Sequence, residues 1–166
     1  MSTYIIRQAT IGDVEIIRQL AADIWPVSYG PILSEDQIAY MLRERYSTEE
    51  LTRQIQQNQQ TFLLARDDTR YVGFASYSPT DDDAFVYRLH KLYCLPATHG
   101  KGYGKALLNQ IVEDIRKLGA KTIELNVHRR NPAKTFYDKM GFEVAYGIDI
   151  PMGPYFLNDY IMRKQL

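Results

Sequence analysis

The chain has 166 residues, of which 45% are hydrophobic and 24% charged, a composition that suits one folded domain over residues 1–166 and excludes a disordered or fibrous chain. Twenty Lys and Arg balance twenty Asp and Glu, so net charge gives no reason to expect binding to nucleic acid or to a membrane surface. A lone cysteine, Cys94, excludes an internal disulfide framework and a cysteine-rich zinc site. The sequence shows neither a leader nor an apolar run long enough to span a bilayer, so we expect a soluble, cytoplasmic protein.

The first third of the chain predicts a short strand and a group of helices. Residues 4–7 form an apolar run typical of a strand. Apolar residues over 14–24 recur at helical spacing, and Pro26 is expected to end that helix. The Ser-Glu-Asp sequence at 34–36 and the Ser-Thr pair at 47–48 predict two more helix starts, because hydroxyl side chains cap helix N-termini and carboxylates favour the first turn.

The rest of the chain alternates between expected strands and expected helices. Alternating or continuous apolar runs predict strands over 61–65, 71–77, 85–95, 122–127, 142–146 and 155–162. Helical periodicity predicts helices over 102–118 and 132–140. An antiparallel run followed by a strand–helix–strand–helix order predicts a mixed α/β or α+β fold around one central sheet.

Charge is unevenly distributed along the sequence. Residues 88–139 hold eleven Lys and Arg against four Asp and Glu, which leaves nine basic and sixteen acidic residues elsewhere. The basic segment could neutralise an anionic ligand and the acidic remainder could attract a cation, or both could be ordinary solvated faces.

Residues 99–105 read HGKGYGK and form a glycine-rich loop before an expected helix. Glycine lets a ligand approach the backbone closely, and the free amides and dipole of a helix N-terminus bind anions. The loop is not a P-loop, because His99 stands where the first glycine is required, and it is not the dinucleotide fingerprint, because Gly104 comes one residue early. It predicts a phosphate-binding loop of another kind, with a merely flexible turn as the alternative.

With its flanking residues this loop resembles motif A of the Gcn5-related N-acetyltransferase (GNAT) superfamily. Residues 92–96 precede it, and Gly102 and Gly104 match the glycine positions of the motif core Arg/Gln-x-x-Gly-x-Gly/Ala, although His99 replaces the usual Arg or Gln. Residues 131–142, NPAKTFYDKMGF, are similar to motif B, in which Asn precedes Ala, Tyr and Gly-Phe. The two motifs occur in the family's order, and the resemblance covers most of the chain.

The resemblance implies a mixed, mostly antiparallel sheet with helices on both faces, whose fourth and fifth strands splay apart to hold acetyl-coenzyme A. Strand backbone would pair with the pantetheine arm, loop amides would hold the pyrophosphate, and the start of the next helix would supply an asparagine. The cofactor-binding residues expected on this basis are Leu92, Tyr93, Cys94, His99, Gly100, Lys101, Gly102, Tyr103, Gly104, Lys105 and Asn131. The surplus of Lys and Arg in residues 88–139 would then face coenzyme A, which is a polyanion.

Tyr137 stands at the position of the family's general acid. When an amine attacks the thioester, the leaving thiolate needs a proton, which a phenol within hydrogen-bond distance can supply. The alternative is a core tyrosine, because Ala133, Phe136, Tyr137 and Met140 recur at the spacing of a buried helix face. We expect Tyr137 to be catalytic.

The general base is left unassigned by the sequence. Many relatives carry a Glu on the fourth strand, but residues 87–92 read YRLHKL and hold no carboxylate. His90 has a suitable intrinsic pKa, and a water chain to Glu35, Asp36 or Glu44 is the alternative.

Two further chemistries are not expected. Cys94 lacks any sign of the supporting His and carboxylate that an acetyl-carrying nucleophile needs, so we interpret it as a small buried strand residue. His90, His99 and His128 lack the spacing of metal ligands, and no metal is predicted.

In the family, the first two helices and the last hairpin shape the acceptor site. The candidate acceptor-binding residues in that material are Trp25, Tyr29, Glu35 and Tyr40. Aromatic faces with carboxylates suit a cation such as a polyamine or an amino sugar. Residues 24–41 and 159–162 resemble bacterial acetyltransferases of the spermidine/spermine type. The alternative is that the aromatic residues belong to the core and that Glu35 is only a helix-start charge.

The predicted function is therefore acetyl-CoA-dependent transfer of an acetyl group to a small primary amine such as a polyamine, by direct attack in a ternary complex. A protein amino terminus or lysine as acceptor is one alternative, and a non-catalytic acyl-CoA-binding sensor is another. A nucleic-acid module is disfavoured by the zero net charge, and the thirteen tyrosines leave room for a homodimer interface.

Overall fold

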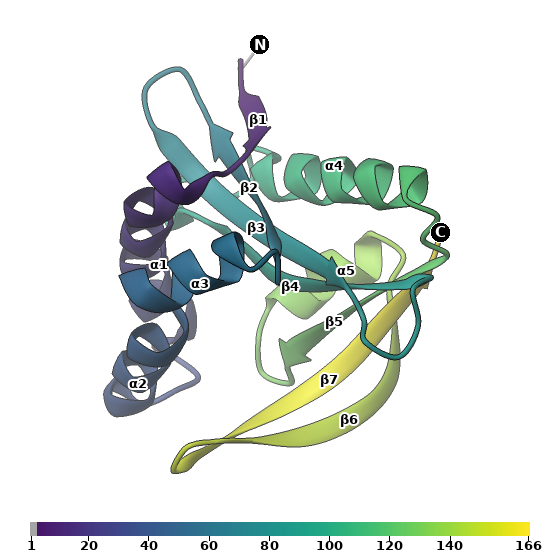
Figure 1. Ribbon diagram of the computed structural model, residues 1–166. Helices are drawn as coiled ribbons and strands as arrows, with labels where there is room; N and C mark the ends of the chain where they lie inside the picture. Colours follow the sequence, from purple (N-terminus) through teal and green to yellow (C-terminus); the bar gives the residue numbers. More distant parts are fainter. Residues whose placement is uncertain (1–2) are drawn as a thin grey trace.

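The computed structural model describes residues 3–166, which form a mixed sheet flanked by helices (Figure 1). The seven strands lie in the order β1-β2-β3-β4-β5-β7-β6. In chain order they are β1 (Ile5–Gln8), β2 (Thr61–Arg66), β3 (Tyr71–Pro79), β4 (Val86–Cys94), β5 (Thr122–His128), β6 (Glu143–Met152) and β7 (Tyr155–Gln165). Every neighbouring pair is antiparallel except β4 and β5, which are parallel. The predicted fold class is confirmed.

Helices cover both faces of the centre of the sheet. They are α1 (Val14–Tyr29), α2 (Glu35–Arg45), α3 (Thr48–Gln56), α4 (Tyr103–Lys117) and α5 (Ala133–Lys139). All residues of β3 from Val72 to Tyr77 are buried, as expected for a central strand with helices on both sides. The expected caps are present, since the Ser34 hydroxyl accepts from the Gln37 amide and the Ser47 hydroxyl accepts from the Glu50 amide. Among residues 3–166, none of the helices has the length and apolar character needed to cross a membrane.

The prediction that Pro26 ends the first helix is wrong. Helix α1 continues to Tyr29, and the Gly30 amide donates to the Pro26 carbonyl at 3.1 Å. Proline removes one helical hydrogen bond. The burial of Trp25 and its stacking on Tyr29, with ring centroids 4.3 Å apart, nevertheless favour continuation of the helix beyond Pro26. The extra turn carries Ser28 and Tyr29 over the centre of the sheet.

Parallel pairing between β4 and β5 is short. It begins at Val86 opposite Thr122 and ends at Leu89 opposite Leu125, although both strands continue beyond that point. The strands therefore part towards their carboxyl ends, as the family resemblance implied. At the same place β4 carries a bulge, because Ser76 of β3 pairs with Lys91 and Tyr77 pairs with Leu89, which leaves His90 between them without a partner on β3.

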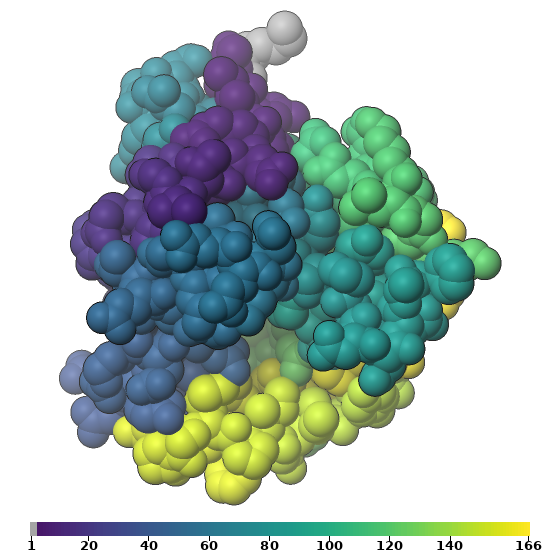
Figure 2. Space-filling model, in the orientation of Figure 1, coloured from purple at the N-terminus to yellow at the C-terminus, as the bar shows by residue number. Residues whose placement is uncertain are grey.

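The last two strands form a hairpin longer than the expected 142–146 and 155–162. Its tip lies against α2, and in the space-filling view this hairpin borders the helices of the N-terminal part (Figures 1 and 2). The rings of Tyr40 and Tyr155 meet edge to face at 5.6 Å, and Gln37 Nε2 donates to the Phe156 carbonyl at 3.3 Å. The expected strand ended at Tyr146 because Gly147 and Pro151, both disfavoured within strands, interrupt the pattern. The extension nevertheless places Ile148, Ile150 and Met152 at alternate, half-buried positions.

The β3–β4 contact beside the parting strands leaves no space for a side chain at Gly73. A Cβ there would lie 2.8 Å from the Tyr93 carbonyl oxygen and 2.8 Å from Cys94 Sγ. We expect Gly73→Ala to lower the unfolding free energy by roughly 1–3 kcal/mol, because overpacking against backbone forces the strands apart. Gly12→Ala is the matched control, since its Cβ would meet only Thr10 Oγ1 at 3.6 Å. Equal denaturant midpoints for the two variants would contradict this account of the β3–β4 contact.

Candidate active site

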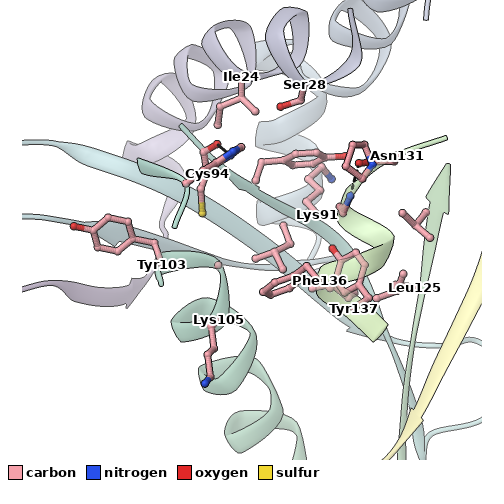
Figure 3. Close-up of a pocket in the computed structure, with 18 of the residues that line it drawn as sticks. Ile24, Ser28, Lys91, Cys94, Tyr103, Lys105, Leu125, Asn131, Phe136 and Tyr137 are labelled. Atoms are coloured by element: carbon pink, nitrogen blue, oxygen red, sulfur yellow. Dashed lines mark hydrogen bonds between the residues drawn. The ribbon is translucent and has the colours of Figure 1, made fainter. Parts of the chain in front are cut away.

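A cleft of about 630 Å³ lies where β4 and β5 part. Its walls come from α1, β4, the loop before α4, the first turn of α4, β5 and α5. Figure 3 shows Ile24 and Ser28 of α1 on one side and Phe136 and Tyr137 of α5 on the other. Its size and mixed lining suit a small organic ligand.

The cleft brings together nearly all of the residues predicted from motifs A and B. The lining includes Leu92, Tyr93, Cys94, His99, Gly100, Gly102, Tyr103, Gly104, Lys105, Asn131 and Tyr137. Lys101 does not line it, and its side chain is exposed. Of the eleven cations in 88–139, Lys91 and Lys105 line the cleft, so most of the basic surplus lies elsewhere.

The glycine loop presents backbone rather than side chains to the cleft. Gly102 caps α4 with φ +88°, and apart from Gly102 itself and its two chain neighbours no described atom lies within 4 Å of where its Cβ would be. The first amides of α4, at Tyr103, Gly104 and Lys105, have no carbonyl partner within the helix and carry the positive end of its dipole. The amides of His99 and Lys101 already donate to the Pro96 and Thr98 carbonyls, which narrows the expected anion site to the helix start.

Tyr137 faces the cleft from α5 and is largely buried. Its ring packs edge to face on Phe136 at 5.2 Å and on Phe142 at 5.6 Å. Desolvation, then the neighbouring Tyr29 and Cys94, raise the pKa of the Tyr137 phenol. The phenol is therefore protonated at neutral pH and can donate a proton.

A second cavity of about 330 Å³ adjoins the cleft. Five residues line both cavities and so form their common wall: Tyr29, His90, Lys91, Tyr93 and Asn126. The Tyr29 and Tyr93 hydroxyls lie 3.1 Å apart, and Asn131 Nδ2 is 3.5 Å from the Tyr29 hydroxyl. This tyrosine pair links the cleft to the second cavity.

Of the predicted acceptor residues, the structure brings Trp25 and Tyr29 into the second cavity. Trp25 Nε1 is buried there without a hydrogen-bond partner among the described residues. Glu35 is exposed in the first turn of α2 and lines neither cavity. Tyr40 also lines neither cavity and instead packs on the hairpin tip, where a Cβ on Gly153 would lie 2.1 Å from its hydroxyl.

Among the candidate bases, only His90 reaches the cavities, since Asp36 and Glu44, like Glu35, line neither. His90 Nε2 lies 2.6 Å from the Ser78 hydroxyl. Desolvation, then the charges of Lys91 and Arg88, lower the pKa of His90, which keeps the imidazole neutral at pH 7. A neutral imidazole bound to a hydroxyl can accept a proton.

Sequence reasoning missed two buried charges in the second cavity, Lys91 of β4 and Asp159 of β7. Each occupies a core position of its strand, because Tyr87, Leu89 and Lys91 are buried in alternation, as are Leu157, Asp159 and Ile161. The sequence signal for such residues is a charged side chain at an alternate position that is otherwise occupied by buried apolar residues of the same strand.

The Lys91 ammonium is held by amide oxygens rather than by a carboxylate. Nζ donates to Gln60 Oε1 at 2.7 Å and to Gln54 Oε1 at 3.1 Å, and it lies 5.0 Å from the centre of the Phe62 ring. Desolvation, then Arg45, lower the pKa of Lys91 to about 7, with a small opposing effect of Glu50. This side chain is thus partly uncharged at neutral pH.

Comparison with known proteins identifies the family to which this chain belongs. Residues 16–142 match the model of the acetyltransferase (GNAT) family. The chain belongs to the GNAT acetyltransferase family. It is 30% identical over 155 residues to an uncharacterized N-acetyltransferase of Mycobacterium tuberculosis, covering 93% of this chain and 98% of the relative. It is 34% identical over 144 residues to the spermidine N(1)-acetyltransferase of Thermoplasma acidophilum, covering 84% of this chain and 88% of the relative.

A solved structure supports the same assignment. The PaiA N-acetyltransferase of Thermoplasma acidophilum, in complex with coenzyme A, superposes with a TM-score of 0.85 and 32% identity over 99% of both chains. This GNAT protein is an acetyl-CoA-dependent N-acetyltransferase, and the predicted enzyme class and cofactor are confirmed.

The residues present fit coenzyme A. The open space at Gly102 admits a group next to the helix start, where free amides favour a phosphate. The edge of β4 beyond Leu89, free of β5, offers backbone groups to an extended arm. Burial raises the pKa of the Cys94 thiol to about 12, so it is not a thiolate nucleophile at neutral pH. Within residues 3–166, His, Cys, Asp and Glu side chains form no group of three that could hold a metal ion.

Gly102→Ala tests the helix-start site. We expect coenzyme A to raise the unfolding temperature of the wild type, because a ligand at 100 times its dissociation constant stabilises by about 2.7 kcal/mol. A Cβ at Gly102 would occupy the space next to the free amides, so Gly102→Ala should reduce this shift.

Gly119→Ala is the matched control. Gly119 follows the other end of α4 with φ +93° and open space around its Cβ, so the backbone strain is similar but the site is far along the helix. An equal loss of the coenzyme A shift in both variants would mean that strain alone, and not the phosphate site, explains the result.

Proposed function

We propose that this enzyme acetylates a small cationic amine of the polyamine type, bound in the second cavity, by direct attack on the acetyl thioester held in the cleft. The observation that carries the proposal is the adjacency of the two cavities through a common wall. Coenzyme A supplies the activated acetyl group, and the protein residues orient the amine, exclude water and move protons.

The walls of the second cavity suit a cation. Trp25 stacks on Tyr29 at 4.3 Å, and the rings of Tyr46 and Tyr93 lie 5.6 and 5.7 Å from Trp25. Aromatic faces attract alkylammonium groups. The lining also holds two carboxylates, of Asp159 and Glu50, which offset the basic side chains of Arg45 and Lys91. The similarity to a relative named spermidine N(1)-acetyltransferase supports the polyamine class.

The size of the second cavity favours a small acceptor over a protein. At about 330 Å³ it suits a short chain of atoms, and the β6–β7 hairpin rests against α2 through Tyr40 and Tyr155 on its outer side. A protein amino terminus or a lysine side chain would have to enter past this hairpin. The non-catalytic acyl-CoA-binding sensor is a separate hypothesis, and a measurement of turnover distinguishes it from an enzyme.

Tyr137 is the proposed general acid. Its protonated phenol faces the cleft from α5 and can give a proton to the departing thiolate sulfur. The Cys94 thiol, protonated through burial, is no competing nucleophile, which supports direct transfer from thioester to amine.

Thiol release from acetyl-coenzyme A tests the proposal. We expect release that depends on acceptor, with polyamines such as spermidine exceeding amino sugars, amino acids and peptides in kcat/KM. Greater turnover of a peptide would favour the protein-acceptor alternative. Tight binding of acetyl-coenzyme A without turnover of any amine would favour the sensor.

Tyr137→Phe should preserve folding and coenzyme A binding while lowering kcat by about 10²- to 10⁴-fold, the range for loss of a general acid. Tyr146→Phe provides the control, because Tyr146 is exposed on β6 and does not line the cleft. The centre of its ring lies 5.8 Å from Arg163 Cζ. A Tyr137→Phe variant with wild-type rates across pH would remove this phenol from the mechanism.

A further inference from the structure

Three carboxylates are buried in the described part of the chain, and they differ in their counter-ions. Asp13 accepts two hydrogen bonds from Arg7, both at 2.8 Å. Glu124 accepts from Arg88 at 2.8 Å and from Arg163 at 3.0 Å. Asp159, 6% exposed, has no Lys, Arg or His nitrogen within 4.0 Å among residues 3–166.

The Asp159 carboxylate accepts only one long hydrogen bond among the described residues, and its donor is a neutral amide. Asn126 Nδ2 donates to one oxygen at 3.4 Å, and the Asn126 amide oxygen is itself bound by Arg88. Asp159 lies opposite His128 in the β5–β7 ladder, so Asn126, His128 and Asp159 share one face of the sheet. That face forms a wall of the second cavity.

A buried carboxylate without a cation destabilises a fold, and ionisable groups with shifted pKa values cluster at functional sites. Among the described residues, Asp159 has only the 3.4 Å hydrogen bond from Asn126, and it lines the second cavity. We therefore expect the cavity to hold a group of complementary charge next to this carboxylate. For Asp159, the complementary group is an ammonium.

We propose that Asp159 binds the ammonium of the acceptor and acts as the general base that deprotonates it. The inference rests on the proposed function of the second cavity. Asn126 donates to Asp159 and also lines the cleft, so an amine held at Asp159 would be close to the cleft that is expected to hold the thioester. Neither the sequence motifs nor the comparisons assign this residue.

The proton balance is complete with the groups present. The R–NH₃⁺ group gives one proton to the Asp159 carboxylate, and the freed nitrogen lone pair forms a bond to the acetyl carbon. The carbon–sulfur bond breaks, and its electrons leave on sulfur as a thiolate. Tyr137 protonates that sulfur and regains a proton from the attacking nitrogen, while Asp159 returns its proton to solvent through the cavity. The products are an N-acetyl amine, coenzyme A thiol and one proton.

The surroundings of Asp159 are compatible with this role. Desolvation raises the pKa of Asp159, while the Asn126 hydrogen bond and the charges of His128, Arg45 and Arg129 oppose the shift. The pKa of His128 is lowered, chiefly by desolvation. Tyr29 of α1 faces the carboxylate as a neutral phenol. A carboxylate with a raised pKa is a better proton acceptor than an exposed one.

Asp159→Asn is the test, assayed with spermidine or with the best amine of the acceptor panel. We expect kcat/KM for the amine to fall about 100-fold or more at pH 7, with coenzyme A affinity unchanged. The deficit should shrink as the pH rises towards the pKa of the amine, because solvent then performs the deprotonation. Asp159→Glu should restore part of the rate, and Asp149→Asn, at an exposed site on β6, should leave it unchanged.

The unfolding temperature of Asp159→Asn distinguishes loss of a general base from misfolding of the variant. Since the folded-state pKa of Asp159 is raised, ionisation destabilises the fold, and this penalty is lost as the pH falls through that pKa. Asp159→Asn should therefore unfold at a higher temperature than the wild type at pH 7 and at a similar temperature at low pH.

Wild-type turnover in Asp159→Asn, or a deficit that stays constant across pH, would overturn the inference. A wild-type enzyme inactive with every amine would contradict the proposed function itself, and the two failures are therefore distinguishable.

Discussion

The parting of β4 and β5 beyond Leu89 and Leu125 leaves one edge of each strand without a protein partner inside the fold. Backbone groups at such an edge need hydrogen bonds from water or from a ligand, so a gap in a sheet is stable only where something fills it. Here the gap opens beside the start of α4, whose free amides favour an anion. The same separation places α5 and Tyr137 across the cleft from α1. Cofactor binding and the proposed proton donor thus follow from one short strand pairing.

The buried charges divide into structural and functional groups by their partners. Asp13 and Glu124 are neutralised by arginines and connect strands to neighbouring segments. Lys91 and Asp159 face the second cavity without an ion-pair partner among the described residues, and both have a pKa displaced towards the neutral form. An enzyme that keeps such groups gives up stability for a site able to bind charge and exchange protons near pH 7.

Much of this architecture could be predicted from the chain alone. Helix starts at Ser34 and Ser47 are local capping signals, and the glycine loop with residues 131–142 indicated both family and cofactor. The extension of α1 past Pro26 depends on tertiary burial of Trp25, which no local rule contains. The second cavity depends on strand register, because it takes the β5–β7 pairing to place Asp159 beside Asn126 and His128. Glu35 and Tyr40 were expected near the acceptor on family grounds, but the turn of α2 directs them to solvent and to the hairpin.

A crystal structure with a bisubstrate analogue, in which coenzyme A is joined through an acetyl bridge to spermidine, tests the arrangement of the two cavities most directly. We expect the pantetheine arm to lie between β4 and β5 along Leu92–Cys94, with the polyamine in the second cavity and one of its nitrogens within hydrogen-bond distance of Asp159. A polyamine chain that leaves the cleft on another side, with the second cavity filled only by water, would contradict this arrangement.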